Sequence, residues 1–313
     1  MSTARIDHIL CPTDFSPFSG QALRHAIALT QSFHAHLKVI HVIPEVFLRG
    51  ESVYASDSWI LTPDVRQAVE AEMQRFLQPA RDAGIDHETE IRSGTPWTEI
   101  LVAAKEKPSD LVVLGSHGHG GLHRLVLGSV AEKLIRSLPC AVMSVRHEGG
   151  PTSLTPGRIA HILCATDFSE TSNQTFETAI AIASRNGAKV TLLHVIERFP
   201  DVKAVEYGAL GADPSNPGLE RHAVERLQQL IASVDARGVE IEPKAKVGRA
   251  YKEILTMAAT EPTDLIMIGA QGHGVIEHLL FGSNAHHVVR AATCPVLTVR
   301  MRSKDDDGAR TEA

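Results

Sequence analysis

Residues 7–16 of this 313-residue chain read DHILCPTDFS, and residues 160–169 read AHILCATDFS, so eight of the ten positions are identical. The two segments begin 153 residues apart, and a register one residue longer aligns Gly115 with Gly269. A repeat of about 150 residues is too long for one unit of a solenoid. The sequence therefore predicts two copies of a complete domain.

The repeat divides the chain into domains and connecting segments. We expect a first domain at residues 1–148, a linker at 149–158, a second domain at 159–302 and a disordered tail at 303–313. Hydrophobic residues make up 43% of the chain and aromatic residues only 4%. Each domain can therefore bury a core built mainly from aliphatic side chains.

Composition and charge exclude several kinds of partner. Lys and Arg number 31 against 37 Asp and Glu, a formal net charge of −6, which argues against binding nucleic acid or an anionic membrane. The apolar runs are shorter than the roughly 18 residues that cross a bilayer, and MSTARIDHIL has no long apolar signal-peptide segment. The four cysteines lie in apolar runs without metal-ligand spacing, which indicates reduced, buried thiols. We therefore expect a cytoplasmic protein.

Within each repeat, short apolar runs alternate with longer segments of helical period. In the first repeat the predicted strands are 8–12, 37–43, 87–91, 111–115 and 141–145, and the predicted helices are 19–33, 64–82, 95–105 and 130–137. Ser16 before Pro17 favours a helix start. The alternation predicts an α/β fold of two tandem open, doubly wound parallel-sheet domains. Ligands of such sheets bind beyond the carboxyl ends of the strands, where the strand order reverses.

A glycine-rich loop follows the fourth predicted strand of each repeat. Residues 111–129 read LVVLGSHGHGGLHRLVLGS, and residues 265–283 read LIMIGAQGHGVIEHLLFGS. Glycines let backbone N–H groups approach phosphate oxygens, and the N-terminus of the following helix adds its dipole. The spacing is neither a Walker A motif nor a GxGxxG dinucleotide motif. The alternative, a turn that only packs a strand against a helix, is weakened because both repeats keep the same G-x2-G-x9-G-S spacing.

With these two loops the chain resembles tandem-domain members of the universal stress protein family, over nearly all of residues 5–302. In that family the G-x2-G-x9-G-S/T pattern marks members able to bind ATP. The resemblance implies an adenine nucleotide alpha-hydrolase-like fold, a role in the stress response and an intrachain pseudo-dimer of the two domains, with homodimerisation left open. It also implies ATP or another adenine nucleotide as the ligand, with or without Mg²⁺.

An aspartate follows the first predicted strand of each repeat, Asp14 in CPTDFS and Asp167 in CATDFS. A carboxylate at this place can accept hydrogen bonds from ribose hydroxyls or from a base amine, and the family pattern has an acidic residue here. The alternative is a helix cap, in which the aspartate accepts hydrogen bonds from free backbone N–H groups. We favour the ligand contact over the cap.

The predicted nucleotide-binding residues come from the first strand end, the second strand and the glycine loop with its helix start. In the first domain they are Pro12, Thr13, Asp14, Val42, Gly115, Gly118, His119, Arg124, Gly128, Ser129 and Val130. In the second domain they are Ala165, Thr166, Asp167, Val195, Gly269, Gly272, His273, Gly282, Ser283 and Asn284. The two valines, Val42 and Val195, are assigned from the resemblance, which places their backbone against the adenine.

The two predicted sites differ in charge. Arg124 of the first loop can reach a phosphate, whereas Glu277 of the second loop would repel one if it faced the site. We therefore expect the first domain to hold the better nucleotide site.

The preferred functional hypothesis is a nucleotide-responsive binding or regulatory module with an unidentified protein partner. The sequence has no Ser-His-Asp order, HExxH motif or Walker pair, so no catalytic residue is assigned. The histidines of the first glycine loop lack carboxylate or thiolate partners at a metal-ligand spacing, so no metal site is predicted. A slow ATP hydrolase, a nucleotidyl-transfer enzyme and a nucleotide-free scaffold remain as alternatives.

Overall fold

The computed structural model describes residues 6–44, 63–118, 127–146, 158–197, 217–272 and 281–300. The chain divides into two compact units between Arg158 and Ile159. Most of the predicted linker and the whole predicted tail lie outside the described residues. In the described ranges, no helix combines the length and the apolar character needed to cross a membrane.

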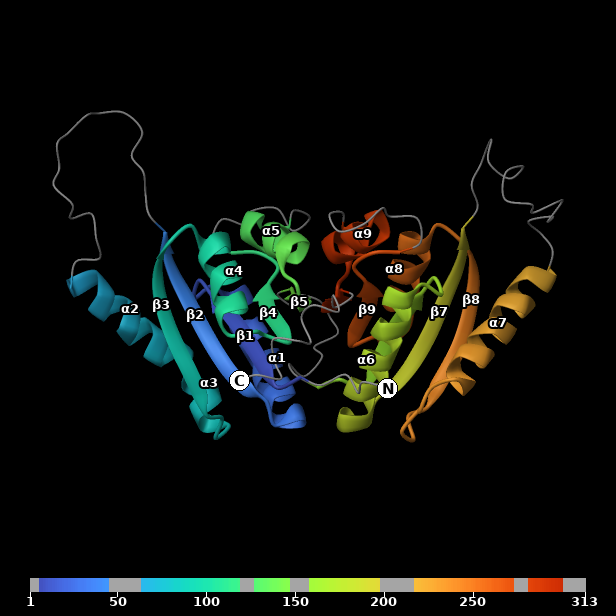
Figure 1. Cartoon of the computed structure of the whole chain (residues 1–313), viewed down its shortest axis with the longest axis horizontal. Coiled ribbons are helices and arrows are strands. Elements are labelled where there is room, and N and C mark those ends of the chain that lie inside the picture. The colour runs from blue at the N-terminus through green and yellow to red at the C-terminus, as the bar shows by residue number, and fades with distance from the viewer. Residues whose placement is uncertain are drawn as a thin grey trace, which may run out of the picture. The chain divides into compact units, whose positions relative to one another are not determined.

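The first unit is built from strands that alternate with helices (Figure 1). Its elements are β1 (His8–Thr13), α1 (Pro17–Phe33), β2 (His36–Pro44), α2 (Pro63–Phe76), α3 (Gln78–Asp82), β3 (His87–Gly94), α4 (Pro96–Glu106), β4 (Leu111–Gly115), α5 (Ser129–Ser137) and β5 (Ala141–Val145). The strands pair in parallel in the order β3-β2-β1-β4-β5. From β1 the chain adds β2 and then β3 on one side, and it then returns to add β4 and β5 on the other side of β1. The strand order reverses between β1 and β4, which is where the fold predicts a ligand site.

The second unit repeats this order. Its elements are β6 (His161–Thr166), α6 (Glu170–Asn186), β7 (Lys189–Glu197), α7 (Pro217–Ala232), β8 (Ile241–Gly248), α8 (Ala250–Thr260), β9 (Leu265–Gly269), α9 (Ser283–Ala291) and β10 (Val296–Val299). The strands are again parallel, in the order β10-β9-β6-β7-β8. The predicted α/β fold with a doubly wound parallel sheet is confirmed for each unit.

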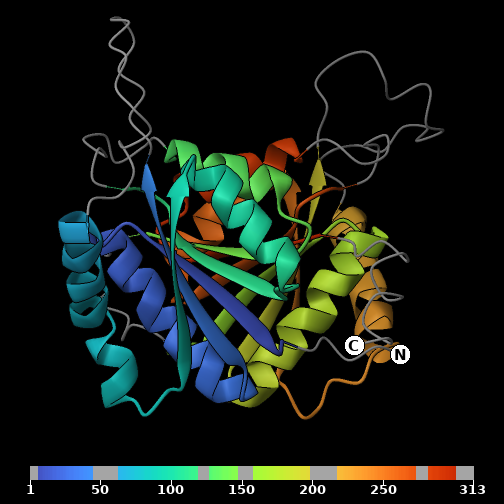
Figure 2. The same ribbon diagram turned by 60° about the vertical axis from the view of Figure 1, so that its left-hand side comes forward.

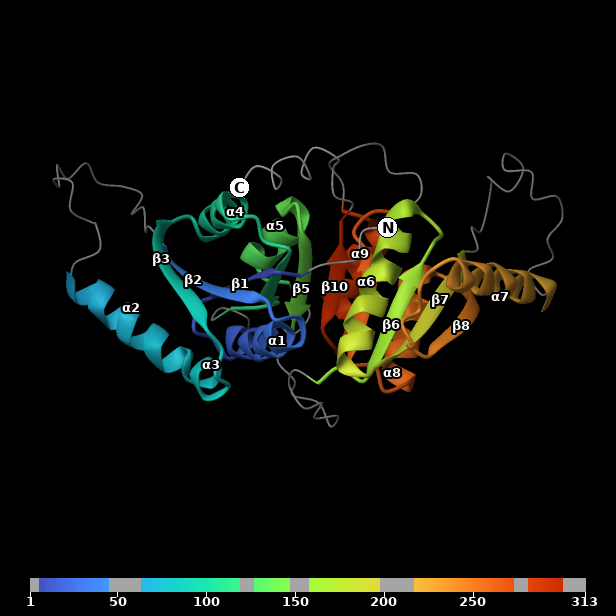
Figure 3. The ribbon, with the colours of Figure 1, turned by 60° about the horizontal axis from the view of Figure 1, so that its bottom comes forward.

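Helices cover both faces of the first sheet. The helix α1 and the α2–α3 pair lie on one face (Figure 2), and α4 and α5 lie on the other (Figure 3). The central strands are consequently buried on both sides, and Ile9, Leu37 and Leu111 have at most 1% of their surface exposed. All four cysteines are free and buried, which confirms the expectation of reduced, buried thiols.

Serine caps start the first helix of each unit, and in the first unit Ser16 and Pro17 predicted this start. Ser16 Oγ accepts a hydrogen bond from Ser19 N at 3.3 Å, and Pro17 occupies the first helical position, where a missing N–H costs nothing. Ser169 Oγ accepts one from Ser172 N at 3.2 Å in the second unit. The first strand of each unit therefore leads directly into a capped helix, with only a short turn between them.

The single helix predicted over residues 64–82 is wrong. The structure has two helices there, α2 and α3, which are separated at Leu77. Pro79 explains the break, because a proline has no N–H to continue the helical ladder and its ring clashes with the preceding turn. Leu77 itself is fully buried, so the interruption leaves the apolar face of the segment on the core.

Candidate functional site

A cavity of about 800 Å³ lies at the carboxyl ends of β1 and β4, against α4 and α5. It therefore stands where the strand order reverses. All nine described residues of the predicted first site line it: Pro12, Thr13, Asp14, Val42, Gly115, Gly118, Gly128, Ser129 and Val130. The other two predicted residues, His119 and Arg124, lie outside the described residues.

A tight turn after β1 orients the carboxylate of Asp14. Thr13 Oγ1 accepts a hydrogen bond from Phe15 N at 2.9 Å, and Asp14 Oδ1 accepts one from Ser16 N at 3.0 Å. Phe15 has a φ of 63°, in the left-handed region that side chains rarely adopt. Asp14 does bond a backbone N–H, as the capping alternative requires, but the N-cap of α1 is Ser16. The turn leaves the second carboxylate oxygen of Asp14 facing the glycine loop.

Two glycines of the loop lie so close to neighbouring groups that a side chain on either would force a neighbour to shift. A Cβ atom on Gly115 would lie 2.9 Å from the backbone carbon of Phe18 and 3.0 Å from Ser19 N. A Cβ atom on Gly118 would overlap Oδ2 of Asp14. The glycines therefore allow the loop after β4 to pack directly on the turn after β1.

His41 supports the same turn from β2. Its Nδ1–H donates to the carbonyl oxygen of Thr13 at 2.8 Å, and its ring stacks on Phe15 with the centroids 4.4 Å apart. Burial lowers the pKa of His41, while the hydrogen bond to Thr13 and the charge of Asp14 oppose the shift. The imidazole is therefore neutral at pH 7. His41 is not among the predicted site residues, although the HVI triplet that begins with it recurs at residues 194–196.

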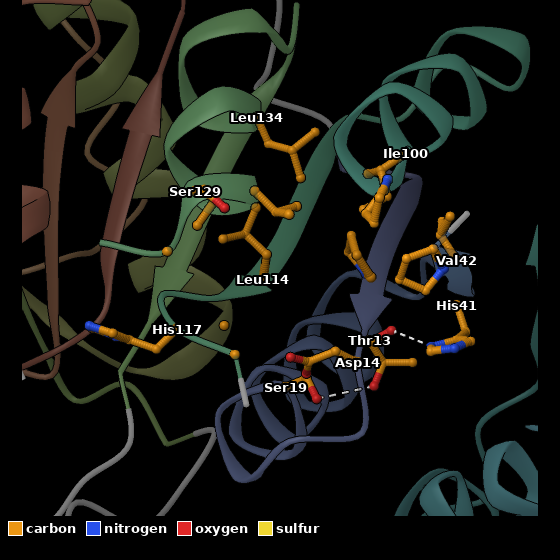
Figure 4. A pocket seen from close by; sticks show the side chains of 18 of the residues that line it. Thr13, Asp14, Ser19, His41, Val42, Ile100, Leu114, His117, Ser129 and Leu134 are labelled. Atoms are coloured by element: carbon orange, nitrogen blue, oxygen red, sulfur yellow. Dashed lines mark hydrogen bonds between the residues drawn. The ribbon is translucent and has the colours of Figure 1, made fainter. Parts of the chain in front are cut away.

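The start of α5 forms the polar end of the cavity opposite Asp14. Gly128 is the N-cap of this helix and provides no side chain to bond the free N–H groups of the first turn. Ser129 opens the helix, as predicted, and Figure 4 shows it across the cavity from Thr13 and Asp14. Free N–H groups, a hydroxyl and the helix dipole together favour an anion at this end.

Apolar side chains form much of the remaining wall. The lining residues that sequence analysis did not assign are Ser19, His41, Pro44, Pro96, Ile100, Leu114, His117, Leu127, Ala131 and Leu134. Most belong to helical or strand patterns, in which a cavity-lining position cannot be told from a core position. The side chain of His117 points away from the labelled group in Figure 4, and its Nδ1 is 2.8 Å from Ser116 Oγ.

Comparison with known proteins agrees with this geometry. A model of the Universal stress protein family matches residues 5–146 and again residues 159–300. The chain belongs to the universal stress protein family, with two tandem Usp domains. It is 35% identical over 141 residues to a universal stress protein of Methanocaldococcus jannaschii, which covers 44% of this chain and 81% of that protein.

Two longer matches span both Usp domains. A universal stress protein of Mycolicibacterium smegmatis is 25% identical over 308 residues, covering 94% of this chain and 97% of that protein. The crystal structure of a universal stress protein from Archaeoglobus fulgidus covers 96% of this chain and 98% of that chain, with a TM-score of 0.69 at 21% identity. The tandem arrangement of two α/β domains is therefore shared with other members of the family.

The second Usp domain repeats the turn and the glycine contact. Asp167 Oδ1 accepts a hydrogen bond from Ser169 N at 3.0 Å, and Phe168 has a φ of 64°. A Cβ atom on Gly272 would lie 2.6 Å from Oδ2 of Asp167. His194 Nδ1–H donates to the carbonyl oxygen of Thr166 at 2.9 Å. The turn geometry is therefore a property of both domains.

The remaining predicted residues of the second site keep the positions of their counterparts. Ala165 lies in β6, Val195 in β7, Gly269 at the end of β9, and Gly282 and Ser283 at the start of α9. His273 lies outside the described residues, as does Glu277, whose charge distinguished the two sites in the sequence. The described parts of the two domains differ in the surroundings of the phenylalanine in the turn. The ring centroid of Phe168 lies 4.0 Å from the guanidinium carbon of Arg226.

No group of three or more His, Cys, Asp or Glu side chains within the described ranges converges as a set of metal ligands. His117 keeps its hydrogen bond with Ser116, and the other two histidines of the first loop are not described. The described residues therefore form no recognisable metal centre.

Proposed function

We propose that the first Usp domain binds an adenine nucleotide, ATP or a close relative, and that the chain acts as a nucleotide-responsive binding or regulatory module. The observation that carries this proposal is the convergence of nine predicted residues on one cavity of about 800 Å³. Small-molecule sites typically have this size and combine an apolar wall with a few polar groups.

Each part of the cavity has a chemical role in this proposal. The apolar wall with Val42 and Leu134 would take the flat adenine. The carboxylate of Asp14 would accept hydrogen bonds from ribose hydroxyls. The start of α5, with Ser129, would take the phosphates, and a Mg²⁺ ion would enter only as part of the bound nucleotide.

A binding role fits the cavity better than fast hydrolysis does. Among the described lining residues, Asp14 is the only carboxylate, and one of its oxygens already bonds Ser16 N. A bound nucleotide would act by favouring one conformation over another, which an unidentified protein partner would detect.

Two measurements on the full chain test the proposal. The first is mass spectrometry of small molecules released when the purified protein is denatured. The second is calorimetric titration with ATP, ADP, AMP and cyclic AMP. We expect a bound adenine nucleotide, and at least about tenfold weaker binding in Asp14→Ala, since a hydrogen bond involving a charged group contributes about 1.5–3 kcal/mol.

Asp167→Ala is the matched control, because Asp167 makes the same turn in the second Usp domain. It is expected to leave binding in the first domain unchanged. No released nucleotide, together with no heat on titration, would overturn the proposal and favour the scaffold alternative. Multiple-turnover phosphate release that depends on Asp14 would favour the slow hydrolase.

A further inference from the structure

The two Usp domains differ at the last residue of their second strand. In the first domain Pro44 ends β2 and pairs with Gly94 of β3. In the second domain Glu197 ends β7 and pairs with Gly248 of β8. The register of the two sheets therefore makes Glu197 the counterpart of Pro44, and Pro44 lines the first cavity.

Two further positions around the first cavity also change character. Pro96 begins α4 and Val130 is the second residue of α5, and both line the first cavity. Their counterparts are Ala250, which begins α8, and Asn284, the second residue of α9. Three apolar positions of the first domain are thus replaced by a carboxylate, a residue with a backbone N–H and an amide.

The three residues of the second domain are bonded together. Glu197 Oε1 accepts a hydrogen bond from Ala250 N at 3.1 Å and another from Asn284 Nδ2 at 3.2 Å. One carboxylate oxygen therefore connects the end of β7 to the starts of α8 and α9. The first domain cannot form this arrangement. Pro96, the counterpart of Ala250, has no backbone N–H to donate, and neither Pro44 nor Val130 has a polar side chain.

The position of the Glu197 carboxylate would disfavour the binding of an anion at the start of α9. Glu197 lies at the start of α8 and at the first turn of α9, where free N–H groups and helix dipoles attract negative charge. The start of α9 follows the second glycine loop and is the place where that loop would present a phosphate. Glu197 is exposed, and its carboxylate places a negative charge of the chain itself beside the expected phosphate position, where it would repel another anion.

We infer that Glu197 is a specificity-determining residue that excludes anionic nucleotides from the second Usp domain, held in place by Asn284. The chain would then bind one adenine nucleotide, in the first domain. This inference rests on the proposed function of the first cavity.

The test is the stoichiometry of ATP binding, measured on the full chain by calorimetry and equilibrium dialysis. The double variant Glu197→Pro with Asn284→Val installs the residues of the first domain. We expect one ATP per chain in the wild type and two in this variant. The reciprocal pair, Pro44→Glu with Val130→Asn, should weaken ATP binding to the first domain on the order of tenfold or more.

Two single variants separate charge from packing. Glu197→Gln keeps an oxygen that accepts both hydrogen bonds but removes the charge, so it should gain weak binding at a second site even if the double variant does not fold. Glu242→Gln is the matched control, because Glu242 is an exposed acid of β8 that pairs with Lys244. It should bind one ATP, like the wild type.

The outcomes separate this inference from the proposed function. Two equivalent ATP sites in the wild type would overturn the inference and support the proposed function. One site in every folded variant, Glu197→Gln included, would also overturn the inference. If the wild type binds no ATP, the proposed function fails. A gain of one site in the double variant would then still support the role of Glu197, and no gain would overturn both.

Discussion

Gly118 lies so close to Asp14 that a Cβ atom built on the glycine would overlap Oδ2 of the carboxylate. The same relationship holds in the second Usp domain, where a Cβ atom on Gly272 would lie 2.6 Å from Asp167 Oδ2. The contact joins a loop after the fourth strand to a turn after the first strand. In both domains the glycine therefore leaves room for the carboxylate of the acidic residue.

Replacing Gly118 with alanine is expected to weaken nucleotide binding in the first domain by about tenfold or more. The added methyl group must displace either the loop or Asp14, and overpacking of this kind costs about 1–3 kcal/mol. Calorimetric titration with ATP measures the effect. Gly272→Ala makes the equivalent clash in the second domain and serves as the control. Equal affinity in Gly118→Ala and the wild type would show that the contact is unimportant for binding.

Gly115→Ala is expected to destabilise the first domain by about 1–3 kcal/mol, because the new methyl group would meet the backbone of Phe18 and Ser19. Gly20→Ala is the matched control. Gly20 lies inside α1, where the atom nearest to a new methyl group is 3.9 Å away. Alanine there should stabilise the domain by about 0.5–1 kcal/mol, since it is the better helix former.

Tryptophan fluorescence during urea unfolding measures both changes. The chain has two tryptophans, Trp59 and Trp97, and both belong to the first repeat, so the signal reports on the first domain. The two substitutions should shift the midpoint in opposite directions. A shift of the same sign in both variants would contradict the packing argument for Gly115.

Local sequence signals predicted the elements that surround the site. The strand at residues 111–115 and the helix start at Ser129 follow from an apolar run and a glycine-serine pair, and the structure has both. The convergence of the nine lining residues follows from parallel topology, because the carboxyl ends of parallel strands meet at one edge. These features depend on short sequence spacings that occur in both repeats.

Other features depend on contacts between distant residues and left no readable pattern. Glu197 at a strand end resembles any exposed acid, and its bond to Asn284 spans 87 residues. The apolar wall of the cavity has the periodicity of an ordinary core. The residues around Leu77 keep helical periodicity across the break, and Pro79 is the one local signal against a continuous helix.

Cys11 is expected to resist thiol reagents in the folded protein. It is fully buried, and burial raises its pKa to about 12, so only about 10⁻⁴ of the thiol is ionised at pH 8. Cys164 occupies the same position in the second domain, and burial raises its pKa as well. Labelling at pH 8, followed by peptide mass spectrometry, should find both unmodified in the native protein and both modified in urea. Prompt native labelling of Cys11 would contradict the buried position.

Stability of the first domain is expected to fall as the pH drops below about 6.5, in part because of His41. Burial lowers the pKa of His41 in the folded state, although the bond to Thr13 and the charge of Asp14 oppose this shift. Between the unfolded and folded pKa values, the unfolded chain binds a proton that the folded domain does not. Stability from this group is therefore complete above the unfolded pKa and is lost as the pH falls towards the folded pKa.

His41→Asn tests this sign, because an amide N–H can still donate to the carbonyl oxygen of Thr13 but does not titrate. The urea midpoint of the tryptophan signal, measured from pH 7.5 to 5.5, should fall less steeply in this variant than in the wild type. His194→Asn changes the equivalent histidine of the second domain, which makes the same bond to Thr166, and it should leave the slope of the first-domain signal unchanged. The carboxylates contribute equally to the pH dependence of stability in all three proteins. A difference in slope between His41→Asn and the wild type is therefore due to His41. Identical slopes in His41→Asn and the wild type would show that this histidine titrates alike in the folded and unfolded states.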